Sequence, residues 1–202
     1  MIGGLLRILV IGLVALVAAM MLMPRIPEPA IATVLDEPRP LPVVALTDQN
    51  NMPFFFDDLR GEPVLVFFGF TNCPDICPLT LAAIAQAMPT LRDRDIAPRV
   101  VFVSVDPARD TPAQIRAYLS GFDPQFIGVT ADDIALSPLL ETLAVSVHKE
   151  TVGRETYNVV HNGTIYALND DGDWAALFGG SSHTPQDIIS DYPKLRMLLE
   201  TE

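Results

Sequence analysis

The sequence predicts an α/β fold in which a mixed β-sheet packs against helices. Two continuous apolar runs, residues 63–70 (PVLVFFGF) and 99–106 (RVVFVSVD), are typical of strands that are buried on both faces. Each run is followed by a predicted helix: residues 78–91 show helical spacing of apolar side chains, and Thr111 begins a capping sequence, Thr-Pro-Ala-Gln. Buried strands that alternate with helices indicate parallel strands joined by right-handed crossover connections.

The remaining segments complete this architecture. Residues 42–56 hold two short apolar segments around a turn-forming Asp-Gln-Asn-Asn cluster, which predicts an N-terminal β-hairpin. Further elements are predicted downstream: a strand over 125–130, a helix over 132–144, a hairpin over 161–179 that closes at Asp170, Asp171 and Gly172, and a last helix after Thr184.

The first residues of the chain predict a membrane anchor. Residues 1–23 carry one charged side chain, Arg7, among apolar residues, and a bilayer span needs roughly 20 such residues. A cleavable signal peptide is the alternative, but the stretch lacks a polar region with an A-x-A-like site. Residues 24–41 are rich in proline and predict an extended tether, so residues 42–202 are expected to form one domain.

The charge of the chain excludes one class of partner. The formal net charge is −12 and the sequence pI is about 4.5. The sequence contains no cluster of Lys or Arg that could neutralise phosphates, so we expect no nucleic-acid partner.

The two cysteines, Cys73 and Cys77, lie between the first buried strand and a helix whose first position we predict at Pro78. Unpaired N–H groups and the macrodipole at a helix N-terminus favour a thiolate over a thiol. The spacing sets the Cα atoms roughly 6 Å apart, which suits a disulfide or joint binding of one ion. A static disulfide across so short a loop would stabilise the fold little, and free core cysteines would be a liability in an exported chain. We therefore expect a redox-active pair or a metal site.

A metal site needs a third ligand, and the chain has three histidines. His148 alternates with valines on an expected strand and is predicted to be a surface residue, whereas His183, just before Thr184, is predicted to be a solvated loop residue. His161 opens an expected strand, and its loop could fold back over the cysteines; the alternative is a satisfied core histidine. Two thiolates and one imidazole suit copper, as Cu(I) or Cu(II), whereas structural zinc needs a fourth protein ligand.

Asp106 ends the second buried strand, at the sheet edge where the cysteine turn is also expected. From that position its carboxylate could stabilise the cysteine loop, or orient a metal ligand without itself binding the ion. The alternative is a turn residue ahead of Pro107.

Four segments together resemble the SCO/SenC family of copper chaperones for cytochrome c oxidase: FFGFTNCPDICPLTL, VSVDPARDTP, FIGVTADDI and YNVVHNGTIYAL. The resemblance runs from about Pro42 to the last helix. It implies a thioredoxin-like fold with an N-terminal β-hairpin, an inserted or C-terminal hairpin that carries the histidine, and an N-terminal transmembrane helix. It also implies that copper is bound by Cys73, Cys77 and His161, and that Asp106 is the family's aspartate near the site.

The sequence departs from the family beside the histidine. The family pattern is Tyr-x-Val-Asp-His-Ser; Tyr157, Val159 and His161 match it, and Val160 and Asn162 replace the Asp and the Ser. The resemblance implies that the ligand itself is kept, and that these two positions bear on its tuning or on copper affinity.

The function implied by the resemblance is delivery of copper to the copper-site subunit of cytochrome c oxidase. The implied setting is a bacterial inner membrane with the domain in the periplasm, since no Arg- and Ser-rich transit peptide precedes the anchor. Another copper chaperone or a thiol reductant would be a further partner. The alternative is a thiol–disulfide oxidoreductase in which Cys73 attacks and Cys77 resolves. A peroxiredoxin-type peroxidase is disfavoured, because Val66 and Phe70 replace the Pro and Thr of its Pro-x-x-x-Thr-x-x-Cys motif.

Overall fold

The computed structural model describes residues 10–13, 15, 28–152 and 156–199. Residues 10–13 and 15 are helical, and the predicted anchor over residues 1–23 otherwise lies outside the described residues. Among the residues that are described, no helix combines the length and the apolar character needed to cross a membrane.

The centre of the fold is an eight-stranded mixed sheet with the strand order β1-β10-β9-β4-β5-β6-β2-β3, and β7 and β8 form a separate two-stranded sheet. In chain order the strands are β1 (Ala32–Arg39), β2 (Leu46–Asp48), β3 (Pro53–Phe54), β4 (Val64–Gly69), β5 (Arg99–Ser104), β6 (Ile127–Thr130), β7 (Val147–Val152), β8 (Thr156–His161), β9 (Ile165–Leu168) and β10 (Trp174–Phe178). Strands β4, β5 and β6 are parallel, and β9 pairs with β4 in the antiparallel direction. The predicted α/β class and mixed sheet are therefore confirmed.

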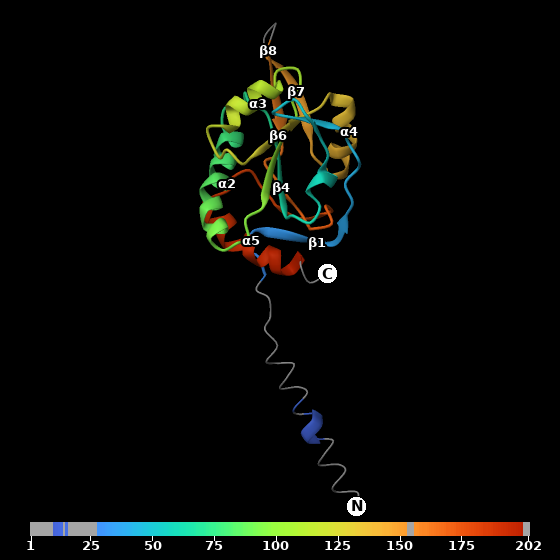
Figure 1. Ribbon diagram of the computed structural model, residues 1–202, viewed down its shortest axis with the longest axis vertical. Helices are drawn as coiled ribbons and strands as arrows, with labels where there is room; N and C mark the ends of the chain where they lie inside the picture. Colours follow the sequence, from blue (N-terminus) through green and yellow to red (C-terminus); the bar gives the residue numbers. More distant parts are fainter. Residues whose placement is uncertain (1–9, 14, 16–27, 153–155, 200–202) are drawn as a thin grey trace, which may run out of the picture.

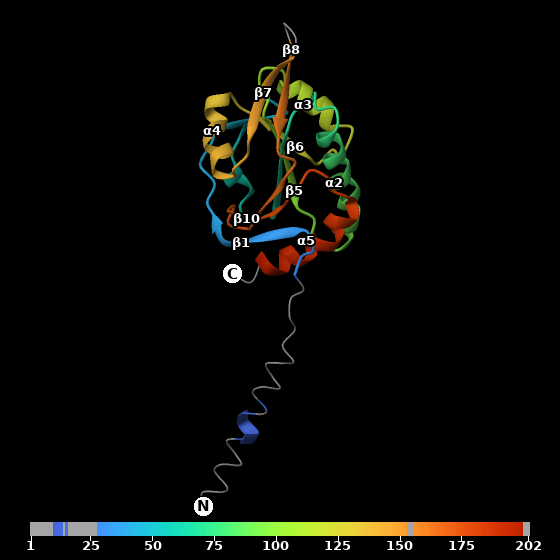
Figure 2. The same cartoon turned by 180° about the vertical axis from the view of Figure 1, so that it is seen from behind.

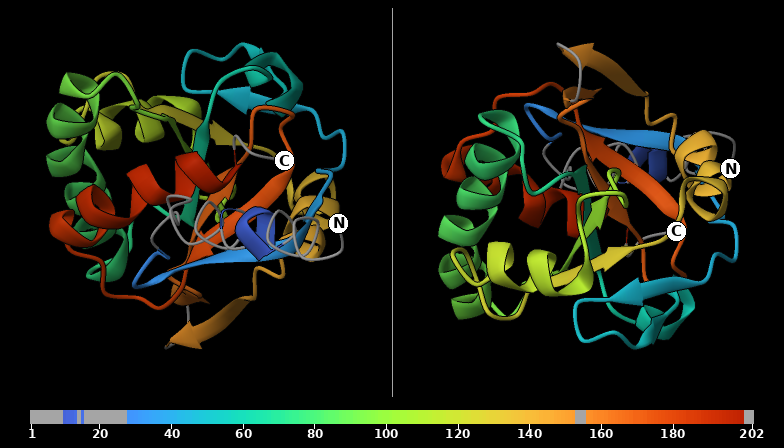
Figure 3. Two further views of the ribbon diagram at one scale, coloured as in Figure 1. Left: turned by 90° about the horizontal axis from the view of Figure 1, so that it is seen from below. Right: turned by 90° about the horizontal axis from the view of Figure 1, so that it is seen from above.

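Within residues 28–152 and 156–199, four α-helices and one 3-10 helix accompany the sheet: η1 (Phe56–Leu59), α2 (Ile76–Asp93), α3 (Pro112–Leu119), α4 (Asp133–Thr142) and α5 (Pro185–Leu199). Seen along the long axis, α2, α3 and α5 lie on one side of the sheet and α4 lies on the other (Figure 3). The predicted start of α3 is confirmed, because the Thr111 hydroxyl accepts the Gln114 N–H and the Gln114 side chain accepts the Thr111 N–H. These contacts satisfy donors that the first helical turn leaves unpaired.

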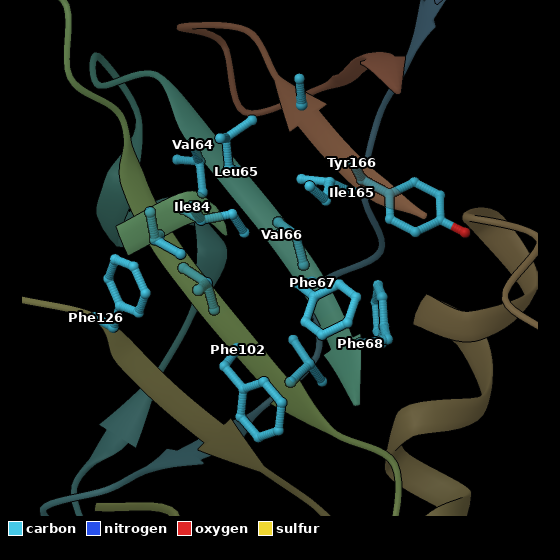
Figure 4. Close-up of a cluster of buried hydrophobic side chains, with 14 of the residues drawn as sticks. Val64, Leu65, Val66, Phe67, Phe68, Ile84, Phe102, Phe126, Ile165 and Tyr166 are labelled. Carbon is cyan, nitrogen blue, oxygen red and sulfur yellow. The ribbon is translucent and has the colours of Figure 1, made fainter. Parts of the chain in front are cut away.

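The core follows from the apolar runs seen in the sequence. Every residue of β4 is buried, as a strand covered on both faces must be. The rings of Phe67 and Phe102, on the neighbouring strands β4 and β5, are 6.4 Å apart between centroids (Figure 4). Phe68 and Tyr166 meet edge to face at 5.6 Å between centroids, which joins β4 to β9. The strand that leads to Cys73 is thus held by packing on both sides.

Three local predictions were wrong. Residues 32–39, expected in the tether, form β1 and pair with β10, because the segment covers an otherwise open sheet edge. Helix α2 begins at Ile76 instead of Pro78, which places Cys77 inside its first turn. The C-terminal hairpin consists of β9 and β10 and starts at Ile165, so His161 does not open it. The turn of that hairpin is confirmed, and Gly172 has the positive φ of 82° that such a turn requires.

A buried carboxylate fastens β1 to the last helix. Asp191 of α5 is fully buried and accepts the backbone N–H groups of Ile31 (2.6 Å) and Ala32 (3.1 Å), and it pairs with Lys194 at 3.0 Å. Burial alone opposes ionisation, but these donors outweigh it and lower the pKa of Asp191 to about 2. The ionised carboxylate is therefore part of the folded state.

We expect Asp191 to make the fold acid-labile. Because the folded-state pKa lies below the ordinary value of 3.8, its contribution is present above about pH 4 and disappears as the pH falls towards 2. The shift corresponds to roughly 2 kcal/mol of unfolding free energy. Measured by urea unfolding between pH 6 and pH 2.5, the unfolding free energy of the wild type should fall with pH, and that of Asp191→Asn should fall less steeply. Parallel curves for the two proteins would contradict the assignment.

Candidate metal centre

Cys73 lies on the turn that joins the central strand to the longest described helix, and Cys77 lies in the first turn of that helix. Strand β4 ends at Gly69, the Cys73 N–H donates to the carbonyl of Phe70 at 3.2 Å, and Asp75 precedes the first turn of α2. Cys77 is completely buried, whereas Cys73 is partly exposed. One sulfur therefore belongs to the core and the other faces outward.

The histidine comes from the separate β7–β8 hairpin. This hairpin lies at the end of the domain opposite β1 and α5, as the front and back views both show (Figures 1 and 2). His161 is the last residue of β8 and pairs in register with Val147 of β7. Residues that alternate along a strand share one face, so Tyr157, Val159 and His161 point to the same side of the hairpin. Val159 is buried, which identifies that side as the one that faces the domain.

The fold brings Cys73, Cys77 and His161 together. The two Sγ atoms and a ring nitrogen of His161 all lie within 4.8 Å of one another. The Cys77 Sγ and the His161 Nε2 are 3.2 Å apart, and the Cys77 N–H donates to the Cys73 Sγ at 3.4 Å. Both cysteines are free thiols in this arrangement. A single soft ion could take all three groups as ligands.

The His161 ring is oriented for this role. Its Nδ1 lies 2.8 Å from the carbonyl oxygen of Asn162, so Nδ1–H is the donor there and Nε2 is left with a lone pair towards the sulfurs. The rings of Phe67 and Phe70 meet the imidazole edge to face, with centroids 6.2 and 5.8 Å away. The ring is therefore held by a hydrogen bond on one side and by aromatic packing around it.

The two thiols differ strongly in acidity. A hydrogen bond from Cys77, the largest effect, lowers the pKa of Cys73 to about 4 against the opposing effect of partial burial, and backbone N–H groups of the turn add to it. The pKa of Cys77 is raised, mainly because Cys77 shares its proton with Cys73 and secondly because Cys77 is buried. At neutral pH, Cys73 is the thiolate of the pair and Cys77 carries the shared proton.

A shallow groove leads to the exposed sulfur. It has a volume of about 220 Å³ and is lined mainly by the cysteine turn and by β8, including Cys73, Ile76, Val160 and His161. The Val160 side chain is 46% exposed, so the position at which the family pattern has an aspartate presents an apolar group to solvent. Asn162, the second departure, donates from its side-chain amide to the Tyr166 hydroxyl at 3.0 Å.

The donor set fits copper better than structural zinc. Thiolates and imidazole are donors that Cu(I) accepts at low coordination number. A structural zinc site takes four protein ligands, and in the described part of the chain no carboxylate or second histidine joins this group. The residues present thus match the three ligands predicted for copper.

The hydrogen bonds of the Asp106 carboxylate are to the part of the site that carries His161, and not to the cysteine turn, among the residues that the structure describes. This buried carboxylate accepts hydrogen bonds from Tyr157 and Arg109, on the side of the His161 hairpin. The cysteine turn is instead held by Asp110, which accepts the Thr71 N–H and hydroxyl at 2.9 and 2.6 Å. The role of Asp110 was not predicted, although the sequence has this second aspartate in VDPARD, just ahead of the helix cap at Thr111.

The other two histidines lie apart from the three ligands. His148 is exposed, as predicted. The prediction that His183 is a solvated loop residue was wrong, since its side chain is only 8% exposed. Its Nε2 lies 2.9 Å from the Gly163 carbonyl oxygen, so His183 ties down the loop that follows His161. A histidine after a Gly-Gly-Ser-Ser segment gives no sequence signal for such a contact.

Comparison with known proteins identifies the family. The SCO1/SenC family pattern matches residues 43–196, which is well over half of the chain. The chain belongs to the SCO1/SenC family. A putative copper-binding protein of Stutzerimonas stutzeri is 36% identical over 141 residues, which cover 68% of each chain.

Solved structures support the same assignment for this SCO1/SenC protein. ScoI of Bradyrhizobium japonicum, solved with copper bound, is 33% identical with a TM-score of 0.68, over 77% of this chain and 98% of ScoI. BsSco, described as a Sco-family cytochrome c oxidase assembly protein with a disulfide switch, is 25% identical with a TM-score of 0.65, over 82% and 99% of the two chains. The domain thus has the thioredoxin-like α/β fold of the Sco proteins.

Proposed function

We propose that this SCO1/SenC protein is a copper chaperone that binds copper through Cys73, Cys77 and His161 and assists assembly of the copper site of a cytochrome c oxidase subunit. The observation that carries the proposal is the convergence of two sulfurs and one ring nitrogen within 4.8 Å. The copper-bound ScoI relative and the assembly role of BsSco support it.

The geometry suits transfer as well as binding. Three protein ligands leave room for an incoming thiolate or imidazole, and ligand exchange can start at the partly exposed Cys73 while Cys77 and His161 still hold the ion. Because its pKa is low, Cys73 is already a thiolate at neutral pH and need not lose a proton when copper binds. The apolar Val160 beside the groove gives a partner a surface to pack against.

We place the protein in a bacterial inner membrane, anchored by residues 1–23, with its domain in the periplasm. The apolar N-terminal sequence supports the anchor, and a lipoprotein of the same family from Bacillus anthracis supports membrane attachment in general. The described chain enters the domain at β1, at the opposite end from the β7–β8 hairpin (Figure 1). An anchor at that end would leave the site free to meet a membrane-bound oxidase subunit, another copper chaperone or a thiol reductant.

The test compares two histidine variants of the full-length chain in detergent. His161→Ala should weaken Cu(I) binding at least about tenfold, or about 1.4 kcal/mol, because one of three ligands is lost. His148→Ala, an exposed position on the same hairpin, is the matched control and should leave the affinity unchanged. Competition of the reduced protein with a chromophoric Cu(I) chelator measures both. Equal affinities for the wild type and His161→Ala would remove His161 from the site.

A second function, thiol–disulfide exchange, is favoured by the contrast between the two thiols. The exposed, low-pKa Cys73 is a suitable attacking group, and the buried Cys77 lies close enough to resolve a mixed disulfide. The disulfide switch described for BsSco supports this candidate. The two functions are compatible, since oxidation of the pair would remove two copper ligands.

A further inference from the structure

The segment that joins β5 to α3 contacts both halves of the metal centre. The cysteine half is the turn that carries Cys73, and the histidine half is the hairpin that carries His161. Residues 104–110 contain two aspartates, Asp106 and Asp110, and both side chains are completely buried. A buried carboxylate is costly unless hydrogen bonds satisfy it, so the partners of these two groups show what the segment holds in place.

Asp110 holds the cysteine half of the centre. It accepts the Thr71 N–H, the Thr71 hydroxyl and the Ser104 hydroxyl, at 2.9, 2.6 and 2.6 Å. Thr71 lies two residues before Cys73, at the start of the turn. These contacts fix the turn to the end of β5 and do not involve the hairpin.

Asp106 holds the histidine half. Its Oδ1 accepts the Tyr157 hydroxyl at 2.5 Å, and its Oδ2 accepts the Arg109 Nε–H. The Arg109 guanidinium also donates to the Tyr157 carbonyl at 3.1 Å and lies 4.0 Å from the centroid of the Tyr157 ring. Tyr157 is therefore bound at its hydroxyl, its ring and its backbone. Burial and the bond to Asp106 raise the pKa of Tyr157, which keeps the hydroxyl protonated as a donor.

Among the described residues, the hairpin has one ion pair to another element of the domain. It is a two-stranded sheet outside the main sheet, and such ribbons are marginally stable by themselves. The ion pair between Lys149 and Asp133 joins it to α4 at 3.0 Å, but both side chains are substantially exposed, which makes the pair weak. Tyr157 lies four residues before His161 on the same face of β8, so its position sets the depth at which His161 meets the sulfurs.

We propose that Asp106, Arg109 and Tyr157 form a latch that positions His161 for the ion, whereas the Asp110–Thr71 contacts position the cysteines. The three are positioning residues, because none of them lies among the three candidate ligands. This inference rests on the proposed copper function and adds which residues control the histidine ligand.

A double-mutant cycle in the full-length chain in detergent tests the latch. Tyr157→Phe removes the hydroxyl but keeps the ring, and should weaken Cu(I) binding about tenfold when His161 is present. In the His161→Ala background the same change should have no further effect, because the latch acts only through that ligand. Thr71→Val is the matched control: it removes one hydroxyl from the cysteine half, so its effect should be the same in both backgrounds. Arg109→Lys should follow the pattern of Tyr157→Phe.

Two further measurements separate positioning from a general loss of structure. In the Cu(II)-loaded proteins, Tyr157→Phe should reduce the imidazole nitrogen hyperfine signal in electron paramagnetic resonance, and Thr71→Val should preserve it. In the metal-free proteins, amide hydrogen exchange of the β7–β8 hairpin should accelerate in Tyr157→Phe and stay at the wild-type rate in Thr71→Val.

The outcomes are distinct. A wild type that binds no copper refutes the proposed function, and the exchange rates then test the latch alone. If the wild type binds copper, an unchanged affinity in Tyr157→Phe overturns the inference, and so does an equal loss in both histidine backgrounds. A loss confined to the background that contains His161 supports it.

Discussion

Cys77→Ser should bind no copper in a titration of the reduced protein, and Cys73→Ser should behave in the same way. The reason is that each change removes one of only two soft sulfur donors, and a single thiolate with one imidazole is a much poorer Cu(I) site. Competition with a Cu(I) chelator, followed by metal analysis of the isolated protein, measures the loss. Near-wild-type copper content in either variant would contradict the assignment of that sulfur as a ligand.

The same two variants should differ in thiol chemistry. The Cys73 thiolate attacks a disulfide substrate, forms a mixed disulfide and expels one substrate thiolate, which takes up a proton from the solvent. The Cys77 sulfur, once deprotonated, then attacks Cys73 and releases the second substrate thiolate, so that the substrate is reduced and the cysteine pair is oxidised. Cys77→Ser should therefore accumulate the mixed disulfide, and Cys73→Ser should form none. Mass spectrometry under non-reducing conditions distinguishes them, and equal accumulation in both would exclude this order of attack.

Phe67→Ala should cause a large loss of stability, about 3–5 kcal/mol, because it empties a fully buried ring position in the central strand. It should also weaken copper binding by the remaining folded protein, since the Phe67 ring packs against the His161 imidazole. Urea unfolding measures the first effect, and chelator competition in the absence of urea measures the second.

Phe126→Ala is the matched control for this prediction. Phe126 is also buried but immediately precedes β6, two strands away from β4 (Figure 4). A comparable loss of unfolding free energy is expected, with copper affinity unchanged. If both variants lose affinity equally, the effect of Phe67 is one of overall stability, and the packing of its ring on His161 has no separate role.

Much of the fold follows from patterns that are local in sequence. The apolar run over residues 63–70 predicts β4 because a strand covered on both faces needs no polar alternation. The Thr111 and Thr184 capping sequences predict the starts of α3 and α5, where side-chain oxygens take up unpaired N–H groups. The start of α2 was missed by two residues, since Asp75 makes no side-chain cap there.

Contacts between distant segments could not be predicted in this way. Strand β1 lies in a segment whose prolines indicate a tether, and it is ordered by pairing with β10 and by Asp191. His183 has the sequence context of a loop residue, yet it is buried against the Gly163 carbonyl. Periodicity reports which face of an element is covered, but it does not report what covers it.

Local sequence patterns are sufficient to predict the α/β class, the position of the cysteine pair at a helix start, and the set of residues from which a metal site could be built. The tertiary structure decided how that site is assembled. It brings His161 to Cys77 across 84 positions of sequence separation, and it directs Asp106 to Tyr157 and Asp110 to Thr71. The physical reason is that spacing fixes neighbours within one helix or strand, whereas the position of a separate hairpin depends on the side chains that it meets when the chain has folded.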